Sequence, residues 1–167
     1  SIGWKSYWVY SAKLACKKQV TTPNQGGKSM SEAFEGGCLC GAVRYKSGAA
    51  PALAGHCQCI DCRKNSGTGH GSHMGVLKDA VTLTGDVTSF DKPADSGNVV
   101  TRCFCPTCGS SVYTYNSGMT DLIFLRASSL DDVDVFKPQF VVYTDSGAAW
   151  DTVDPTLPTF PGMPPNM

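Results

Sequence analysis

Eight of the nine cysteines in this 167-residue chain fall into three tight clusters, Cys38-x-Cys40, Cys57-x-Cys59-x-x-Cys62 and Cys103-x-Cys105-x-x-Cys108. Thiolate sulfur binds zinc tetrahedrally; structural sites use four protein ligands, and catalytic sites keep one position open. A disulfide framework is typical of short chains with an even number of cysteines, unlike this one. The spacing therefore predicts a zinc protein with one closed and one open site. Cys16 stands apart, and we assign it no role.

The closed site is predicted from two halves. Residues 104–109 (FCPTCG) have the sequence of a zinc knuckle, in which two thiolates share a tight turn and the final glycine accepts an unusual backbone geometry. We expect the other half from Cys38 and Cys40, because residues two apart on an extended strand point to one face. The predicted structural zinc ligands are Cys38, Cys40, Cys105 and Cys108.

The remaining cluster, Cys57, Cys59 and Cys62, has no equally clear fourth partner. Three thiolates on a divalent ion carry a net charge near −1, which favours exchange of water for a soft ligand such as a thiol. The cluster therefore predicts a catalytic zinc and chemistry on sulfur. The alternative is a second closed site completed by Cys103 or a histidine. We expect Cys103 itself to be a small buried hydrophobic residue.

Three histidines are candidates for proton transfer or binding. His56 precedes the open cluster and is either a hydrogen-bonded strand residue or a functional one. His70 and His73 lie in the glycine-rich segment 67–75, predicted to be a loop, where an imidazole could be a fourth ligand, a general acid or base, or a substrate anchor. We take His70 and His73 as candidate catalytic residues, with surface histidines as the alternative.

The secondary-structure pattern is mainly β. Strands are predicted at residues 42–46, 81–84, 98–102, 122–125 and 140–143, and eighteen glycines and ten prolines disfavour long helices. One helical turn near residues 61–65 would bring Cys62 back towards Cys57 and Cys59. The proline-rich end, 155–165, is expected to run extended over the surface and not as a central strand.

Composition narrows the location and partners. Fourteen basic and fourteen acidic residues give no net charge, which disfavours nucleic-acid binding, although Arg63 and Lys64 could anchor a carboxylate. No apolar stretch is long enough to span a membrane, and residues 1–27 lack the apolar core of a signal peptide. We expect a cytoplasmic protein with an appendage at residues 1–29, leader-like or vector-derived in character, and one domain at residues 30–167.

The motifs resemble those of a known family. Residues 36–45 (GGCLCGAVRY), 56–67 (HCQCIDCRKNSG) and 104–110 (FCPTCGS) are similar to the glutathione-dependent formaldehyde-activating enzyme family, which also includes centromere protein V. Residues 83–85 (LTG), 127–132 (ASSLDD), Trp150 and 157–161 (LPTFP) add to the resemblance, which runs from about residue 35 to the end. The segment 70–73 departs from common members, where small or apolar residues are more usual.

The resemblance implies a small zinc-stapled β domain of two packed antiparallel sheets with two Zn²⁺ ions per chain. It implies that Cys38, Cys40, Cys105 and Cys108 hold the structural zinc and that Cys57, Cys59 and Cys62 hold the catalytic zinc, the same ligands as those predicted from spacing. The activity it implies is condensation of glutathione with formaldehyde, a carbon-sulfur lyase reaction.

We expect an enzyme that activates a thiol such as glutathione for reversible addition to formaldehyde or another small carbonyl, as a monomer or homodimer. The alternatives are a non-catalytic zinc-binding interaction module and a lyase that acts on a different sulfur compound. A fourth protein ligand at Cys57, Cys59 and Cys62, with no neighbouring cavity, would favour the module.

Overall fold

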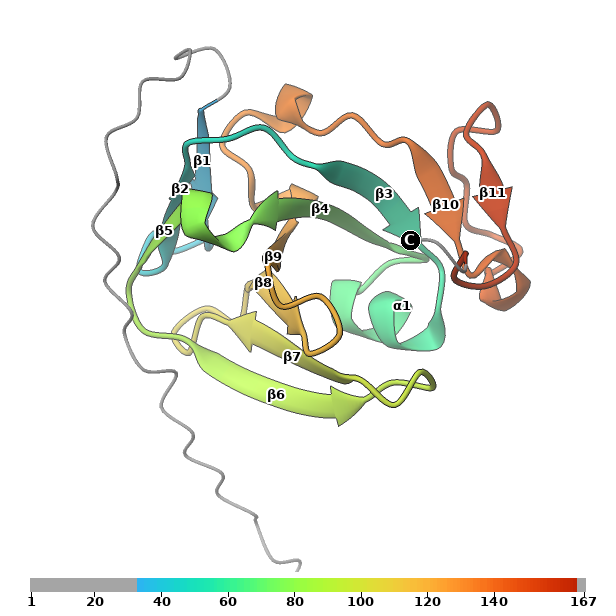
Figure 1. Ribbon diagram of the computed structural model, residues 1–167, viewed down its shortest axis with the longest axis horizontal. Helices are drawn as coiled ribbons and strands as arrows, with labels where there is room; N and C mark the ends of the chain where they lie inside the picture. Colours follow the sequence, from blue (N-terminus) through green and yellow to red (C-terminus); the bar gives the residue numbers. More distant parts are fainter. Residues whose placement is uncertain (1–32, 165–167) are drawn as a thin grey trace, which may run out of the picture.

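Two β-sheets and a short α-helix make up residues 33–164, the part of the chain that this computed structural model describes (Figure 1). The smaller sheet is antiparallel and has the strand order β1-β2-β5. Its strands are β1 (Phe34–Gly37), β2 (Arg44–Ser47) and β5 (Val81–Thr84). The predicted appendage at residues 1–29 and Cys16 lie outside the described residues.

The larger sheet has eight strands in the order β11-β10-β3-β4-β9-β8-β7-β6. Its strands are β3 (Leu53–Cys57), β4 (Gly71–Leu77), β6 (Thr88–Pro93), β7 (Val99–Phe104), β8 (Ser111–Asn116), β9 (Leu122–Arg126), β10 (Phe140–Val142) and β11 (Thr159–Phe160). Short 3₁₀ turns lie at Lys78–Ala80, Ala127–Ser129, Val133–Val135 and Thr144–Ser146.

The mainly β prediction with two sheets is confirmed, but the larger sheet is not wholly antiparallel. Strand β10 runs parallel to both β3 and β11. The reason is the long connection over residues 127–139, which carries the chain past β4 and β3 so that β10 enters beside β3 in the same direction. The proline-rich end forms β11 at the sheet edge and not a central strand, as expected.

Both sheets contribute to one hydrophobic core. In the central strands, alternation sends Met74 and Val76 of β4 and Leu125 of β9 to the same buried face. Tyr45 of β2 meets them from the smaller sheet and is 1% exposed. Cys103 is also fully buried in this cluster, in agreement with its predicted hydrophobic role.

Strand predictions held where β-branched or apolar residues form a run. The predicted strand at 81–84 coincides with β5, and those at 42–46, 98–102, 122–125 and 140–143 overlap β2, β7, β9 and β10. The loop predicted for segment 67–75 was wrong over most of its length, because β4 begins at Gly71. Gly75 of this segment faces a large cross-strand neighbour, because a Cβ there would lie 2.9 Å from Leu53 Cγ.

The α-helix α1 (Ile60–Ser66) confirms the helical turn predicted at 61–65. It begins after Cys59, whose side chain accepts a hydrogen bond from the Cys62 amide, and ends at Gly67, where a left-handed backbone (φ 74°) favours glycine. Within residues 33–164 there is no helix with the length and apolar character to cross a membrane.

The close approach of β1 to the 3₁₀ turn Ala127–Ser129 gives a test of the fold. A Cβ at Gly36 would lie 2.2 Å from the Ser129 carbonyl oxygen and 2.4 Å from the Tyr45 hydroxyl. We therefore expect Gly36→Ala to lower the free energy of unfolding by about 1–3 kcal/mol in chemical denaturation. Gly48→Ala is the control, because its nearest neighbour would be 3.9 Å away. Equal stability of the two variants would contradict the packing described here.

Candidate functional site

Four sulfur atoms from two turns form the first cysteine cluster: Cys38, Cys40, Cys105 and Cys108, with ligand atoms within 4.8 Å of one another. The Cys40 sulfur lies 3.6 Å from that of Cys38 and 3.7 Å from that of Cys105. Sulfurs about 2.3 Å from a tetrahedral zinc are about 3.8 Å apart, so the spacing fits this ion. The prediction had placed Cys38 and Cys40 on a strand; they lie in the turn between β1 and β2.

The backbone of these two turns favours thiolate. Gly41 and Gly109 each come directly after a cysteine, and both have a positive φ (77° and 75°), which bends the backbone around the sulfurs. Burial acts to raise the pKa of Cys38, but hydrogen bonds, among them one of 3.2 Å from the Val43 amide to its sulfur, lower it overall. Hydrogen bonds from Ser110 lower the pKa of Cys108 to about 5. The backbone of Ala42 acts to lower the pKa of Cys40, but hydrogen bonding to Cys38 and Cys108 raises it to about 12. Two of the four thiols therefore ionise readily, and a bound cation would be needed for Cys40 to do so as well.

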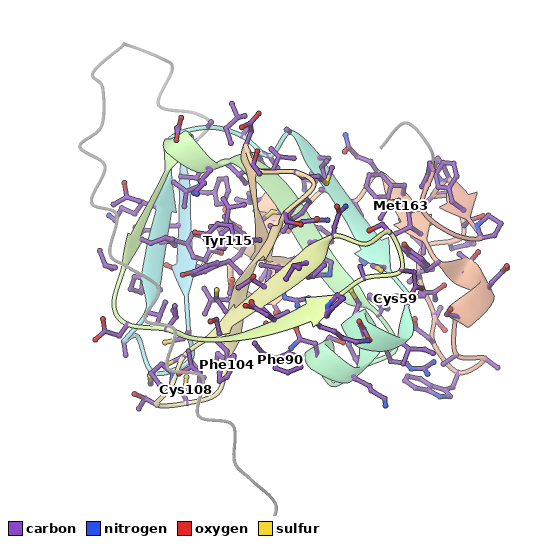
Figure 2. All side chains as sticks on the ribbon, turned by 60° about the horizontal axis from the view of Figure 1, so that its bottom comes forward. Cys59, Phe90, Phe104, Cys108, Tyr115 and Met163 are labelled. Carbon is purple, nitrogen blue, oxygen red and sulfur yellow. The ribbon has the colours of Figure 1, made fainter. Side chains whose placement is uncertain are left out.

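The second cluster consists of Cys57 at the end of β3, Cys59 before α1, and Cys62 in α1, again with sulfurs within 4.8 Å. Figure 2 shows Cys59 well separated from Cys108, so the two clusters are distinct sites. Among residues 33–164, no histidine, cysteine or carboxylate completes this second group as a fourth ligand. The arrangement therefore has three candidate ligands and not four.

The three thiols of this cluster ionise unequally. Hydrogen bonds from Cys57 and Cys62 lower the pKa of Cys59 to about 2, whereas hydrogen bonding to Cys59 and Cys62 raises the pKa of Cys57. One thiolate therefore forms readily, and its negative charge opposes ionisation of the neighbours. A bound divalent cation is what would allow all three to be thiolates together.

His73 and Arg126 lie directly beside Cys62. They are cross-strand partners on β4 and β9. The His73 Nε2 atom is 3.5 Å from the Cys62 sulfur, and Nη1 of Arg126 is 3.1 Å from Nε2 and 3.3 Å from Nδ1 of the same imidazole. Arg126 also donates to Asn65 Oδ1 from Nη2. Burial, and then the charge of Arg126, hold the pKa of His73 well below its usual value, so this imidazole is neutral.

His70 has a different environment. Its Nδ1 lies 2.9 Å from Asp151 Oδ1, and Gln58 donates to the other oxygen of the same carboxylate, also at 2.9 Å. Burial opposes ionisation of Asp151, but the hydrogen bonds from Gln58 and His70 lower its pKa overall. His56 packs edge-on against the His70 ring and bonds to Ser72, which fits the strand interpretation of His56. The structure thus separates the two candidate catalytic histidines into two environments.

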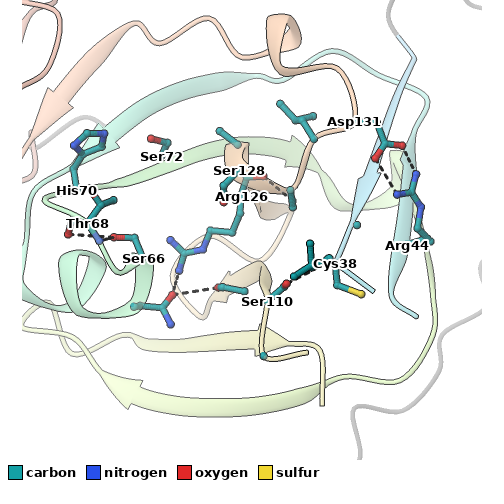
Figure 3. Close-up of a pocket in the computed structure, with 18 residues that line it drawn as sticks. Cys38, Arg44, Ser66, Thr68, His70, Ser72, Ser110, Arg126, Ser128 and Asp131 are labelled. Carbon is teal, nitrogen blue, oxygen red and sulfur yellow. Dashed lines mark hydrogen bonds and ion pairs between the residues drawn. The ribbon is translucent and has the colours of Figure 1, made fainter. Parts of the chain in front are cut away.

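A pocket of about 630 Å³ opens beside the four-cysteine cluster, and Cys38 lines it (Figure 3). Cys57, Cys59 and Cys62 do not line it; Arg126, which contacts His73 beside Cys62, connects its wall to the three-cysteine cluster. Its wall combines hydroxyl groups with residues of α1, the end of β9 and the Cys38 turn: Gly37, Cys38, Leu39, Arg44, Asn65, Ser66, Thr68, His70, Ser72, Gly109, Ser110, Ser111, Arg126, Ala127, Ser128, Ser129, Leu130 and Asp131. In Figure 3 the Arg126 side chain projects into the middle of this group. His70 lines the pocket, whereas His73 is not among the lining residues.

The charges of the pocket are unevenly paired. Arg44 Nη1 donates to Asp131 Oδ1 at 2.9 Å, and this hydrogen bond lowers the pKa of Asp131. Arg126 has no carboxylate partner among residues 33–164. Arg63, considered as a carboxylate anchor, instead donates to the Ser146 carbonyl, and neither it nor Lys64 lines the pocket. The pocket therefore has an excess of positive charge.

Sequence reasoning missed Arg126, Asn65, Asp151 and Gln58. Arg126 had one usable signal, a charged residue that ends the apolar run 122–125. Asp151 follows Trp150, which had been noted only as part of a resemblance. Neither residue is near the cysteines in the sequence, so their role in the site depends on the fold.

Comparison with known proteins gives the family. The sequence profile of the family described as "Glutathione-dependent formaldehyde-activating enzyme" matches residues 33–146. The chain belongs to this family.

Two relatives bear on the assignment. A Halomonas elongata protein named "Putative glutathione-dependent formaldehyde-activating enzyme" is 32% identical over an alignment of 104 positions that covers 59% of this chain and 66% of that protein. The crystal structure of a Rhodobacter sphaeroides protein superimposes with a TM-score of 0.50 at 19% identity, over 63% of this chain and 97% of that one. This second likeness concerns the fold alone.

The two clusters are expected to respond differently to loss of a ligand. Cys105 is fully buried and joins the turn after β1 to the turn after β7. Cys105→Ser should lower the melting temperature by more than about 10 °C if a metal ion joins the two turns, because it removes one of the four sulfurs that could hold that ion. Cys62→Ser should remove one equivalent of bound zinc, with a much smaller fall in the melting temperature.

The measurement is zinc per chain by elemental analysis of reduced protein, together with thermal denaturation. Equal destabilisation by the two variants would contradict a structural role confined to the four-cysteine cluster.

Proposed function

We propose that this protein is a zinc-dependent enzyme of carbon-sulfur chemistry, which activates a thiol such as glutathione for reversible addition to formaldehyde or another small carbonyl. The observation that carries the proposal is a cluster of three cysteines with no fourth ligand among residues 33–164, connected through His73 and Arg126 to the wall of a polar pocket of about 630 Å³. Family membership and the name of the Halomonas relative support the choice of glutathione and formaldehyde.

The donor sets suit two zinc ions. Sulfur ligands select zinc over hard cations such as magnesium, and the sulfur spacings of the four-cysteine cluster match a tetrahedral ion. Cys38, Cys40, Cys105 and Cys108 would hold the structural ion, and Cys57, Cys59 and Cys62 the catalytic one. The catalytic zinc would supply a Lewis acid that keeps an incoming thiol in its thiolate form.

His70 is the proposed proton carrier. Asp151 accepts from Nδ1, so the lone pair of the neutral imidazole, the form that acts as a base, is at Nε2. His70 lines the pocket, and its side chain is 19% exposed. A base held by a buried carboxylate in a fixed orientation is suited to accept a proton from a bound substrate and return it.

The proposed reaction balances without an oxidant or reductant. A bond forms between the thiol sulfur and the carbonyl carbon, the carbon-oxygen π bond breaks, and the thiol proton ends on the new hydroxyl oxygen. His70 accepts the thiol proton first and then donates it to the oxygen. The reverse sequence cleaves the carbon-sulfur bond, which is lyase chemistry.

The setting we propose is the reducing cytoplasm, where metal-binding thiols stay reduced. The partners are then a small thiol and a small carbonyl, and the enzyme acts as a monomer or homodimer.

Exchange between free formaldehyde and its glutathione adduct tests the proposed activity. Zinc-loaded protein should accelerate this exchange in NMR exchange spectroscopy, and Cys62→Ser, which loses a ligand of the catalytic site, should abolish the acceleration. Wild-type protein with both metals bound and no acceleration would disprove the formaldehyde version. A screen of other thiols for binding would then separate a different sulfur substrate from a non-catalytic module.

The role of His70 has its own test. His70→Gln keeps a polar side chain near Asp151 but removes the base, so exchange should slow by about 10²-fold or more. Lys64→Gln is the control, because Lys64 is exposed on α1 and does not line the pocket. An unchanged rate in His70→Gln would mean that the proton moves by another route.

A further inference from the structure

The starting point is a buried positive charge that has no negative partner. Arg126 is 4% exposed, it makes no ion pair within residues 33–164, and its Nε atom is buried without a hydrogen-bond partner there. A buried charge is strongly destabilising unless it is compensated. Arg102, which is also buried, is a second cation whose charge opposes that of Arg126, and its own partner is Asp61.

The three-cysteine cluster is the nearest source of negative charge. Burial lowers the pKa of Arg126, while the charges of Cys62, Cys57 and Cys59 oppose this effect. Three thiolates and a divalent ion have a net charge near −1. The metal-loaded cluster would therefore be a counter-ion for Arg126. Binding of a substrate thiolate to the metal would add a further negative charge, which the positive charge of Arg126 would stabilise.

The geometry connects the two through His73. An arginine only donates hydrogen bonds, so the imidazole nitrogen that faces Nη1 must accept. Nη1 lies 3.1 Å from Nε2 and 3.3 Å from Nδ1, so either nitrogen is within its reach and the Cys62 sulfur decides between them. If Nδ1 accepts, the Nε2 proton faces that sulfur at 3.5 Å. The other tautomer would direct a lone pair at a thiolate, which is repulsive. Thiolate at Cys62 therefore selects the tautomer that donates to it.

The surrounding backbone leaves room for this arrangement. A Cβ at Gly71 would lie 2.6 Å from His73 Nε2 and 3.1 Å from both Arg126 Nη1 and Cys62 Cβ. His73 and Arg126 are paired across neighbouring strands, and Asn65 on α1 accepts from the far side of the guanidinium. The four side chains in this series of contacts therefore all come from regular elements and not from a loop: Asn65 and Cys62 from α1, Arg126 from β9 and His73 from β4.

We infer that Arg126 and His73 form an outer-sphere relay to the three-cysteine cluster. Arg126 orients His73 and supplies the compensating charge, and His73 donates from Nε2 to the Cys62 sulfur. Both are positioning residues: they help the cluster to hold its metal and to accept an anionic thiolate. This inference rests on the proposed metal occupancy, but it does not require that formaldehyde is the substrate.

Cobalt and zinc binding provide the test. Arg126→Gln should raise the zinc dissociation constant of the three-cysteine cluster by about 10–100-fold in competition with a chromophoric chelator. In the Co²⁺-loaded protein, His73→Phe should move the sulfur-to-cobalt charge-transfer band to longer wavelength, because a thiolate without its hydrogen bond is more easily oxidised. His73→Gln, which retains an N–H donor, should restore most of the wild-type band.

Two controls accompany these variants. Lys64→Gln removes one positive charge from the exposed surface of α1 and should leave both readouts unchanged. The four-cysteine cluster in the same chain should keep its own metal equivalent in every variant, which shows that the fold is intact. If Arg126→Gln does not fold, Arg126→Lys replaces it; lysine keeps the charge but lacks the planar fork, so a smaller loss of affinity is expected.

The relay is disproved if Arg126→Gln and His73→Phe bind metal with wild-type affinity and an unchanged charge-transfer band. It is also disproved if cobalt spectra show that His73→Phe has lost a direct nitrogen ligand, because His73 would then belong to the inner sphere. A wild-type cluster that binds no metal overturns both the relay and the proposed function. Affected variants together with no formaldehyde exchange would support the relay and reject only the proposed activity.

Discussion

The pairing register of β4 between β3 and β9 is the constraint on which the site depends. Gly71 lies opposite Cys57, and His73 lies opposite Arg126, while Met74, the residue after His73, points into the core. Because side chains alternate along a strand, a slip of one residue would put His73 into the core and Met74 beside Cys62. The apolar core residues thus determine the position of the polar ones, and the chemistry is held by the same hydrogen bonds that hold the sheet.

The two cysteine clusters show how one ligand type gives two kinds of site. In the first, sulfurs come from two turns that close on each other, each with a glycine in the left-handed region. In the second, Cys57 ends a strand and Cys62 lies on a helix, and no fourth ligand atom among residues 33–164 completes the group. The local backbone, and not the residue type, distinguishes a closed from an open arrangement.

The cysteine clusters, the family and the mainly β class could be predicted because each has a local signature. Spacing along the chain is enough to group Cys57, Cys59 and Cys62, and the short helix follows from the need to return Cys62 to its partners. The pairing of β10 with β3 and the roles of Arg126 and Asp151 could not be predicted in this way. The bond between His70 and Asp151 joins residues 81 positions apart, and no local pattern encodes such a contact. Segment 67–75 was predicted as a loop because it is rich in glycine. Gly71 and Gly75 instead lie on β4, where the missing side chain leaves space for neighbouring residues.

The bond between His70 and Asp151 also has an evolutionary consequence. The carboxylate that orients His70 comes from a stretch of chain that contributes no cysteine. A single substitution at residue 151 would therefore change the acid-base character of the pocket while both cysteine clusters stayed intact. Within a lineage that keeps its thiolate clusters, new reactions could arise by drift in this distal stretch, so metal content alone would be a poor guide to what each descendant transforms.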